Sequence, residues 1–151
     1  MHRLVRRFLK TGIFFLGVGL LLGAWMLVRR ELWGIYPTTY LMSAHTHAIL
    51  VGFVMMMILG IALWMFPRPA REDVRYRPGL AAAAYWLVTL GTALRLAGEI
   101  ARSGMDGMAL RVVVVAGGLA QVAGIGLFFA TMWTRIRATG SAAREERGER
   151  F

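Results

Sequence analysis

The sequence contains no cysteine. Disulfides, iron–sulfur clusters and thiolate metal sites are therefore excluded, because each requires cysteine sulfur. Histidine is scarce, with three residues in 151, and acidic residues number 8 against 18 lysines and arginines. The apolar runs hold no carboxylate pair, and the chain shows neither a phosphate-binding glycine loop nor a nucleophile and base at a suggestive spacing. The sequence thus predicts no complete catalytic site in this chain.

Long apolar runs dominate what the sequence does contain. Hydrophobic residues make up 58% of the chain, its mean hydropathy is +0.57, and four apolar runs are each long enough to cross a bilayer. We expect an all-α, polytopic membrane protein, a bundle of four transmembrane helices in the lipid bilayer. The expected helices span about 11–28, 43–66, 80–98 and 110–134, so that residues 1–134 form the membrane domain. Residues 135–151 form a charged tail, expected to be a frayed helix or disordered.

The net charge is +10, and the positions of the basic residues along the chain fit this membrane topology. Lysine and arginine gather at the ends of the apolar runs rather than on a soluble basic face, so nucleic acid is not an expected partner. Four basic residues precede the first run, four follow the second and five lie in the tail, whereas the other two connections hold two and three. The positive-inside rule therefore predicts cytoplasmic termini in a multi-pass protein of the cytoplasmic (inner) membrane.

Two of the histidines, His45 and His47, open the second apolar run. Ionisable side chains at membrane depth are costly, so a functional role is the first hypothesis for this pair. In a helix, positions i and i+2 lie about 200° apart around the axis and about 3 Å apart along it. The two side chains therefore face nearly opposite directions at one depth. They cannot readily hold one heme or one compact zinc ion alone, but one helix can offer a ligand to each of two neighbours.

The second run also resembles a known protein family. A helix with a cytoplasmic amino terminus precedes it, Ala44-His45 opens it at the outer face, and it continues through Gly60 to the ending Trp64-Met65-Phe66-Pro67. This pattern resembles the start of subunit I of the heme-copper oxidases and nitric oxide reductases. In that family the histidine that opens helix two is an axial ligand of the low-spin heme, and His45 matches it best. His45-Thr46-His47 is similar to the His-Thr-Asn found there in nitric oxide reductases.

The family comparison also shows what this chain lacks. Subunit I has twelve helices, whereas this chain has four apolar runs and no further histidines for the copper site, the high-spin heme or the second low-spin ligand. In the family, three four-helix arcs carry ligand histidines on their second helices, and one such helix has a His-x-His pair that serves two hemes. The resemblance therefore implies a homo-oligomer, with a trimer favoured. A b-type heme would lie between His45 of one subunit and His47 of its neighbour.

Arginines on the same side of the membrane are candidate partners for heme propionates. Arg95 and Arg111 lie near the outer ends of the third and fourth runs, where they can make charge-assisted hydrogen bonds. Arg29 and Arg30 are further candidates. The alternative is that these arginines snorkel to the interface, or that Arg95 pairs with Glu99 one helical turn later.

Three functions remain open. The first is a heme b protein that transfers electrons or senses a gas, with electron transfer favoured because bis-histidine iron has no open position. The second is a heme-free accessory or assembly subunit that associates with a terminal oxidase or a nitric oxide reductase. The third is a zinc or copper site formed by His45 and His47 across an oligomer interface. The histidines can also simply hydrogen-bond a backbone carbonyl, or a hydroxyl such as that of Thr38 or Thr39.

Small and polar residues inside the runs predict helix contacts. Gly19 and Gly23 have the GxxxG spacing that lets another helix approach closely. Gln121 is expected to hydrogen-bond a neighbouring helix rather than a ligand. Small residues also recur at four-residue spacing on the second run, where they predict close packing either between subunits or within one: Ala44, Ala48 and Gly52.

Overall fold

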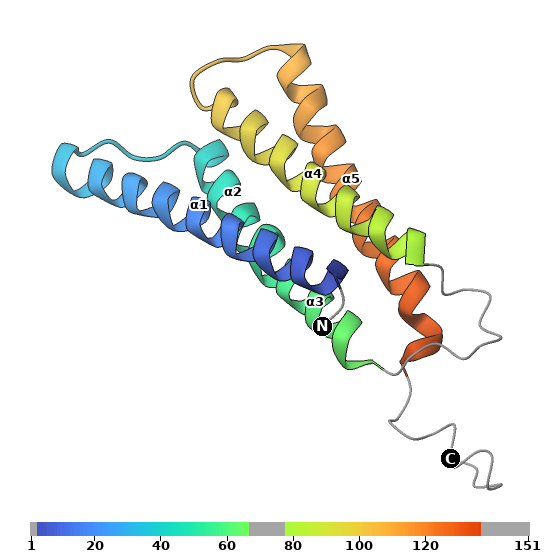
Figure 1. The fold of residues 1–151 in the computed structure, drawn as a ribbon. Coiled ribbons are helices and arrows are strands. Elements are labelled where there is room, and N and C mark those ends of the chain that lie inside the picture. The colour runs from blue at the N-terminus through green and yellow to red at the C-terminus, as the bar shows by residue number, and fades with distance from the viewer. Residues whose placement is uncertain (1–2, 67–77, 137–151) are drawn as a thin grey trace, which may run out of the picture.

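The described part of the chain consists of long helices and contains no strand (Figure 1). A computed structural model describes residues 3–66 and 78–136, so the charged loop at 67–77 and the tail from 137 lie outside the described residues. The elements in order are α1 (Arg3–Trp33), α2 (Thr39–His47), η1 (Ala48–Met55), α3 (Met56–Met65), α4 (Pro78–Arg102), α5 (Met108–Met132) and η2 (Trp133–Arg135). The segments α2, η1 and α3 follow one another as one continuous span. Four helices are therefore long and apolar enough to cross a membrane, which confirms the expected fold class.

The helices extend beyond the apolar runs. The first begins at Arg3 rather than near residue 11, and α4 continues to Arg102 rather than ending near residue 98. A helix satisfies its own backbone hydrogen bonds, and long cationic side chains reach back to the interface, so basic residues do not end it. Hydropathy marks the part of a helix inside the hydrocarbon, not the whole helix.

The second span changes its winding directly after the histidines. Residues Ala48–Met55 form a π-helix, with α-helix on both sides. A π-helix has wider turns and bonds each N–H to the fifth preceding carbonyl, and such segments recur at functional sites. The change of winding rotates the residues of α3 relative to those of α2, compared with a straight α-helix.

The four spans pack as two hairpins side by side (Figure 1). In one, α1 lies along the second span; in the other, α4 lies along α5; the second span and α4 join the two hairpins. The hairpins contact each other near the two connections, where α2 lies against α4 and the guanidinium of Arg102 lies 4.3 Å from the centroid of the Tyr40 ring. They also meet at the amino-terminal end, where the ring of Phe8 packs edge to face on Tyr85 and Phe128, with centroids 5.1 and 5.9 Å apart. A smaller core cluster lies toward the histidines: Phe15, Ala44, Ala48 and Leu96.

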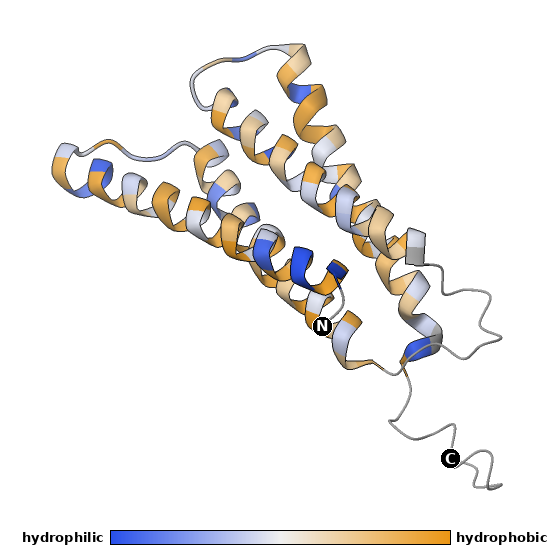
Figure 2. Cartoon of the chain, viewed as in Figure 1, coloured by the Kyte–Doolittle hydropathy of each residue, from blue (hydrophilic) through white to orange (hydrophobic). Residues whose placement is uncertain are grey.

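The outer surface of the helices is apolar, as Figure 2 shows by the hydrophobic colour along their length. On α5 the exposed side chains include Val115, Leu119 and Val122, which are 60%, 65% and 70% exposed. Large apolar side chains on the outside of a helix are expected where lipid replaces water. The surface therefore agrees with the membrane assignment.

The GxxxG pair of α1 packs against the second span of the same chain. A Cβ atom at Gly19 would collide with the side chain of Ile49, and one at Gly23 would lie 2.8 Å from Cε1 of His45. The small-residue stripe of the second span is likewise internal, because Ala44 and Ala48 are fully buried and Gly52 lies against Phe15. Of the two alternatives for this stripe, the structure therefore shows packing within one subunit.

One carboxylate orders the connection between α4 and α5. Asp106 accepts hydrogen bonds from Nη2 of Arg102 at 3.3 Å, from Nε of Arg111 at 3.2 Å and from the backbone N–H of Gly107 at 2.9 Å. These bonds, that of Arg111 first and that of Gly107 second, lower the pKa of Asp106 from 3.8 to about 2. The carboxylate is the charged form that all three donors stabilise.

Arg135 closes the opposite end of the bundle. Its guanidinium donates to the backbone carbonyls of Leu63 at 3.2 Å and Phe66 at 2.9 Å, and the side chain is 4% exposed. Carbonyls at a helix C-terminus lack intrahelical partners, and a cation there is favoured by the helix dipole. Residue 135, which the sequence places at the start of the tail, is therefore part of the folded domain.

Replacing Arg135 should destabilise the bundle. Arg135→Met leaves the carbonyls at the end of α3 without their donor, at a cost of about 1–3 kcal/mol for a buried unpaired group. Thermal unfolding in mild detergent measures this as a lower midpoint. Arg111→Met is the matched control, since its ion pair with Asp106 is exposed to solvent and contributes little to stability. Equal midpoints for Arg135→Met and the unchanged protein would contradict the capping role.

The carboxyl of Asp106 should stay ionised at unusually low pH. Because its pKa is lowered on folding, its stabilising contribution is complete above the ordinary value of 3.8 and is lost as the pH falls through about 2. A titration of the side-chain carboxyl by ¹³C NMR measures the midpoint directly. In Arg111→Met the midpoint should move back toward 3.8; an unchanged midpoint there would show that Arg111 is not the main cause.

Candidate functional site

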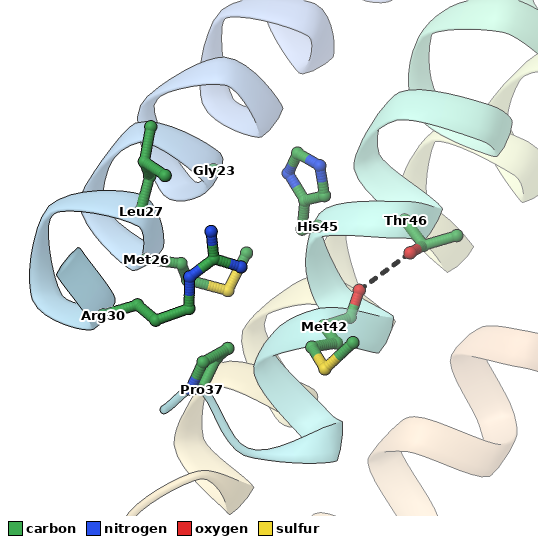
Figure 3. A pocket seen from close by; sticks show the side chains of 8 residues that line it. All are labelled: Gly23, Met26, Leu27, Arg30, Pro37, Met42, His45 and Thr46. Atoms are coloured by element: carbon green, nitrogen blue, oxygen red, sulfur yellow. Dashed lines mark hydrogen bonds between the residues drawn. The ribbon is translucent and has the colours of Figure 1, made fainter. Parts of the chain in front are cut away.

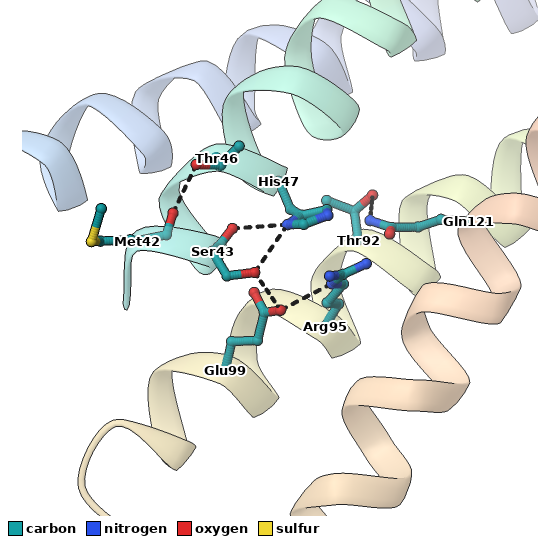
Figure 4. Close-up of polar contacts among 8 residues, drawn as sticks. All are labelled: Met42, Ser43, Thr46, His47, Thr92, Arg95, Glu99 and Gln121. Atoms are coloured by element: carbon teal, nitrogen blue, oxygen red, sulfur yellow. Dashed lines mark hydrogen bonds and ion pairs between the residues drawn. The ribbon is translucent and has the colours of Figure 1, made fainter. Parts of the chain in front are cut away.

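The two histidines lie on opposite flanks of α2, as their spacing predicts. His45 turns toward α1, where its Nδ1 lies 2.9 Å from the backbone carbonyl of Gly19 (Figure 3). His47 turns toward α4, and its Nδ1 lies 2.9 Å from the carbonyl of Ser43, one turn earlier on its own helix (Figure 4). Both side chains are half-buried. One iron or zinc ion therefore cannot take both rings from the same chain.

Both imidazoles present an unprotonated Nε2. A carbonyl oxygen only accepts hydrogen bonds, so the proton of each neutral ring lies on Nδ1. Within residues 3–66 and 78–136 neither Nε2 has a hydrogen-bond partner. In that part of the chain the buried side-chain atoms without a hydrogen-bond partner are Thr89 Oγ1, Glu99 Oε2 and Arg102 Nε. The Nε2 atoms of the histidines are not among them, so each Nε2 is accessible. An Nδ1–H held by a carbonyl beside an open Nε2 is the usual arrangement of a metal-ligating histidine.

His45 lies in a surface pocket between α1 and α2 (Figure 3). The pocket has a volume of about 310 Å³ and is lined by Gly23, Met26, Leu27, Arg30, Pro37, Met42, His45 and Thr46. Most of this lining is apolar, with Arg30 as its charged member. Gly23 is what admits the imidazole, because any larger side chain there would occupy the place of the ring. The pocket thus combines a nitrogen ligand, an apolar wall and a cation.

His47 belongs to a polar network that joins α2 to α4 (Figure 4). The Oγ of Ser43 lies 3.3 Å from Nδ1 of His47 and donates to Oε1 of Glu99 at 2.8 Å. Nε of Arg95 donates to the same Oε1 at 3.0 Å. Glu99 is 3% exposed, so this carboxylate is buried among its partners. The pairing of Arg95 with Glu99 is the alternative that the sequence leaves open for Arg95, whereas the contact with Ser43, which joins two separate helices, is not predicted from the sequence.

The arginines predicted to meet heme propionates are distributed differently from expectation. Arg95 lies on the His47 side and is paired with Glu99, and Arg111 is paired with Asp106 in the exposed connection. Neither lines the pocket of His45. Arg30, which the sequence names only as a further candidate, does line it. A signal for Arg30 was its place about two helical turns beyond Gly23, on the same face of α1.

Several other polar groups near the histidines make structural hydrogen bonds. Gln121 on α5 donates to Oγ1 of Thr92 on α4 at 3.0 Å, as expected for an interhelical hydrogen bonder. Thr38 caps α2 by accepting from the backbone N–H of Leu41, so it is not a partner of either histidine. In the described part of the chain no group of three histidine and acidic residues could hold a metal ion. A metal site built from His45 and His47 would therefore need a second copy.

Comparison with known proteins places the chain in a family. The family model described as "Cytochrome C and Quinol oxidase polypeptide I" matches residues 3–145, which include all four spans. No curated protein and no solved structure matches the chain. Because the match covers most of its length, the chain belongs to the cytochrome c and quinol oxidase polypeptide I family, the subunit I family of the heme-copper oxidases.

Proposed function

We propose that this membrane protein binds a low-spin heme b between subunits, with His45 of one copy and His47 of the next as axial ligands. The observation that carries the proposal is the pair of accessible Nε2 atoms on opposite flanks of one helix, each ring held through Nδ1. Bis-histidine ligation leaves no open position on the iron, so electron transfer is favoured over gas sensing.

The residues around His45 suit a heme. Its Nε2 is the nitrogen ligand, and Met26, Leu27 and Met42 offer an apolar wall for the macrocycle. Nε of Arg30 pairs with Glu31 at 2.7 Å, and its other guanidinium nitrogens can make charge-assisted hydrogen bonds to propionates. On the side of His47, Arg95 remains a candidate for binding a propionate. Arg111 would first have to break its ion pair with Asp106. When bound, the heme would supply one-electron redox chemistry; the protein would hold it, orient it and exclude water.

The divergence of the histidines favours a closed oligomer. Met42, Thr46 and Leu50 form an exposed stripe at four-residue spacing on the second span, between the His45 flank and the His47 flank. Copies that meet along this stripe would bring the His45 pocket of one toward the His47 flank of the next. Three copies with four spans each would supply twelve helices, and a threefold arrangement closes on itself.

Heme ligation is tested by the optical spectrum. The protein is expressed with ample heme supply, purified in mild detergent and recorded in the oxidised and dithionite-reduced states. We expect a low-spin b-type spectrum that is lost in both His45→Ala and His47→Ala, because each iron needs one ligand of each kind. Thr131→Val is the matched control, since the Thr131 hydroxyl donates to the carbonyl of Phe128 on its own helix, away from both histidines.

Two results would contradict the proposal. Well-folded, heme-replete protein without a Soret band would favour a heme-free accessory subunit of an oxidase or nitric oxide reductase. Bound zinc or copper without porphyrin, found by metal analysis of the same sample, would favour the metal site. A low-spin spectrum that survives either histidine substitution would overturn the ligand assignment.

The subunit contact is tested by cross-linking through introduced cysteines, for which the cysteine-free sequence is well suited. Thr46→Cys lies on the proposed interface stripe, and a short bis-maleimide should join copies efficiently there. Val122→Cys is the control, because Val122 is 70% exposed on the outer face of α5. SDS gel electrophoresis reads the result. Equal cross-linking at both positions, or cross-linking at residue 122 alone, would rule out contact along the second span.

A further inference from the structure

We propose that Glu99 is a positioning residue for His47: acting through Ser43, it orients the imidazole and increases the electron density at its Nε2. This inference rests on the proposed function, because it takes His47 as a heme ligand. It adds Glu99 as a residue that acts on this ligand through Ser43. It also makes the two ligands of the heme unequal.

The direction of the hydrogen bonds follows from the chemistry of the groups. The Glu99 carboxylate only accepts, so the hydroxyl of Ser43 donates to its Oε1 at 2.8 Å. The lone pairs of that hydroxyl are then left for Nδ1–H of His47, 3.3 Å away, which also donates to the Ser43 carbonyl. The network therefore runs one way, from His47 through Ser43 to a negative charge. Such outer partners fix ring orientation and raise ligand basicity.

Burial makes this network more than a helix-surface ion pair. Glu99 is 3% exposed, and taking a carboxylate out of water is costly unless its partners compensate. Both donors, Ser43 and Arg95, converge on Oε1, while Oε2 is buried without a partner. A pair that served only to join helices would be expected to satisfy both oxygens. Here the satisfied oxygen is the one that faces α2 and the histidine (Figure 4).

The other histidine has no comparable partner. Nδ1 of His45 donates to the neutral carbonyl of Gly19, and none of the described residues that line its pocket is a carboxylate. The Ser43 hydroxyl that His47 meets is itself bonded to a carboxylate, and hydrogen bonds in such a chain polarise one another. His47 should therefore be the more strongly electron-donating ligand, although the two residues have the same chemistry and lie at the same depth.

The test compares Glu99→Gln and Ser43→Ala with two matched controls. Glu99→Gln keeps the shape and removes the charge; Ser43→Ala cuts the connection and leaves the Arg95–Glu99 pair intact, so it remains informative if the first variant folds poorly. Thr131→Val removes a hydroxyl that donates to the carbonyl of Phe128 on its own helix, away from both histidines, and Asp106→Asn removes an exposed carboxylate. Both controls should behave as the unchanged protein.

The first readout needs no heme. In heme-free protein with labelled histidine, NMR should show the Nδ1 proton of His47 moving upfield in Glu99→Gln and in Ser43→Ala, with the ring signals of His45 unchanged. A Ser43→Ala variant with unaltered His47 signals would overturn the inference, whatever the heme content. The same shift in Thr131→Val would also overturn it, because the effect would then not depend on the hydrogen bonds between Ser43 and Glu99.

The second readout uses the heme-loaded protein. Weaker electron donation by His47 disfavours the oxidised iron, so both variants should raise the midpoint potential, and neither control should change it. An unchanged potential alongside an altered ring signal would overturn the electronic effect. Absence of heme from the unchanged protein would instead overturn the proposed function, while the ring signals still decide whether Glu99 acts on His47.

Discussion

A polar group inside a bilayer must find its hydrogen-bond partner within the protein, and this constraint organises the structure. Each backbone group is satisfied by its helix, and side chains pair across helices. Gln121 bonds Thr92, and Thr11 bonds Tyr85 at 2.8 Å. Among the described residues Thr89 Oγ1 and Glu99 Oε2 are also unpaired, but they are buried, whereas the open Nε2 atoms of the two histidines are ligand atoms that are not fully buried. That exception is why they carry the functional proposal.

Close helix approach is what brings each histidine to its surroundings. Gly23 leaves space for the ring of His45, and Gly19 supplies the carbonyl that holds it. Two residues further along α2, His47 meets the α4 side, where Ser43 bridges it to Glu99. One short segment of helix therefore places two equivalent side chains in unlike environments. In an oligomer every interface would receive one ring of each kind, so that the asymmetry of the site arises from identical subunits.

Much could be predicted because it depends on properties local to the chain. Run length and hydropathy predicted four spans, and the rotation of about 100° per residue predicted that His45 and His47 diverge. The family resemblance found at the second run agrees with the match over residues 3–145. Helix ends were less accurate, as Arg135 shows, because a residue that leaves the apolar run can still be bound by the helix beside it.

By itself, then, the sequence determined the fold class, the span that carries the histidines and the directions in which they point. Only the tertiary structure decided that Arg30 rather than Arg111 lies beside His45, that Glu99 reaches Ser43 on another helix, and that the second span includes a π-helix. The physical reason is that helices in lipid associate through close packing and interhelical hydrogen bonds. Those contacts join residues distant in the chain, and no local period along the sequence encodes them.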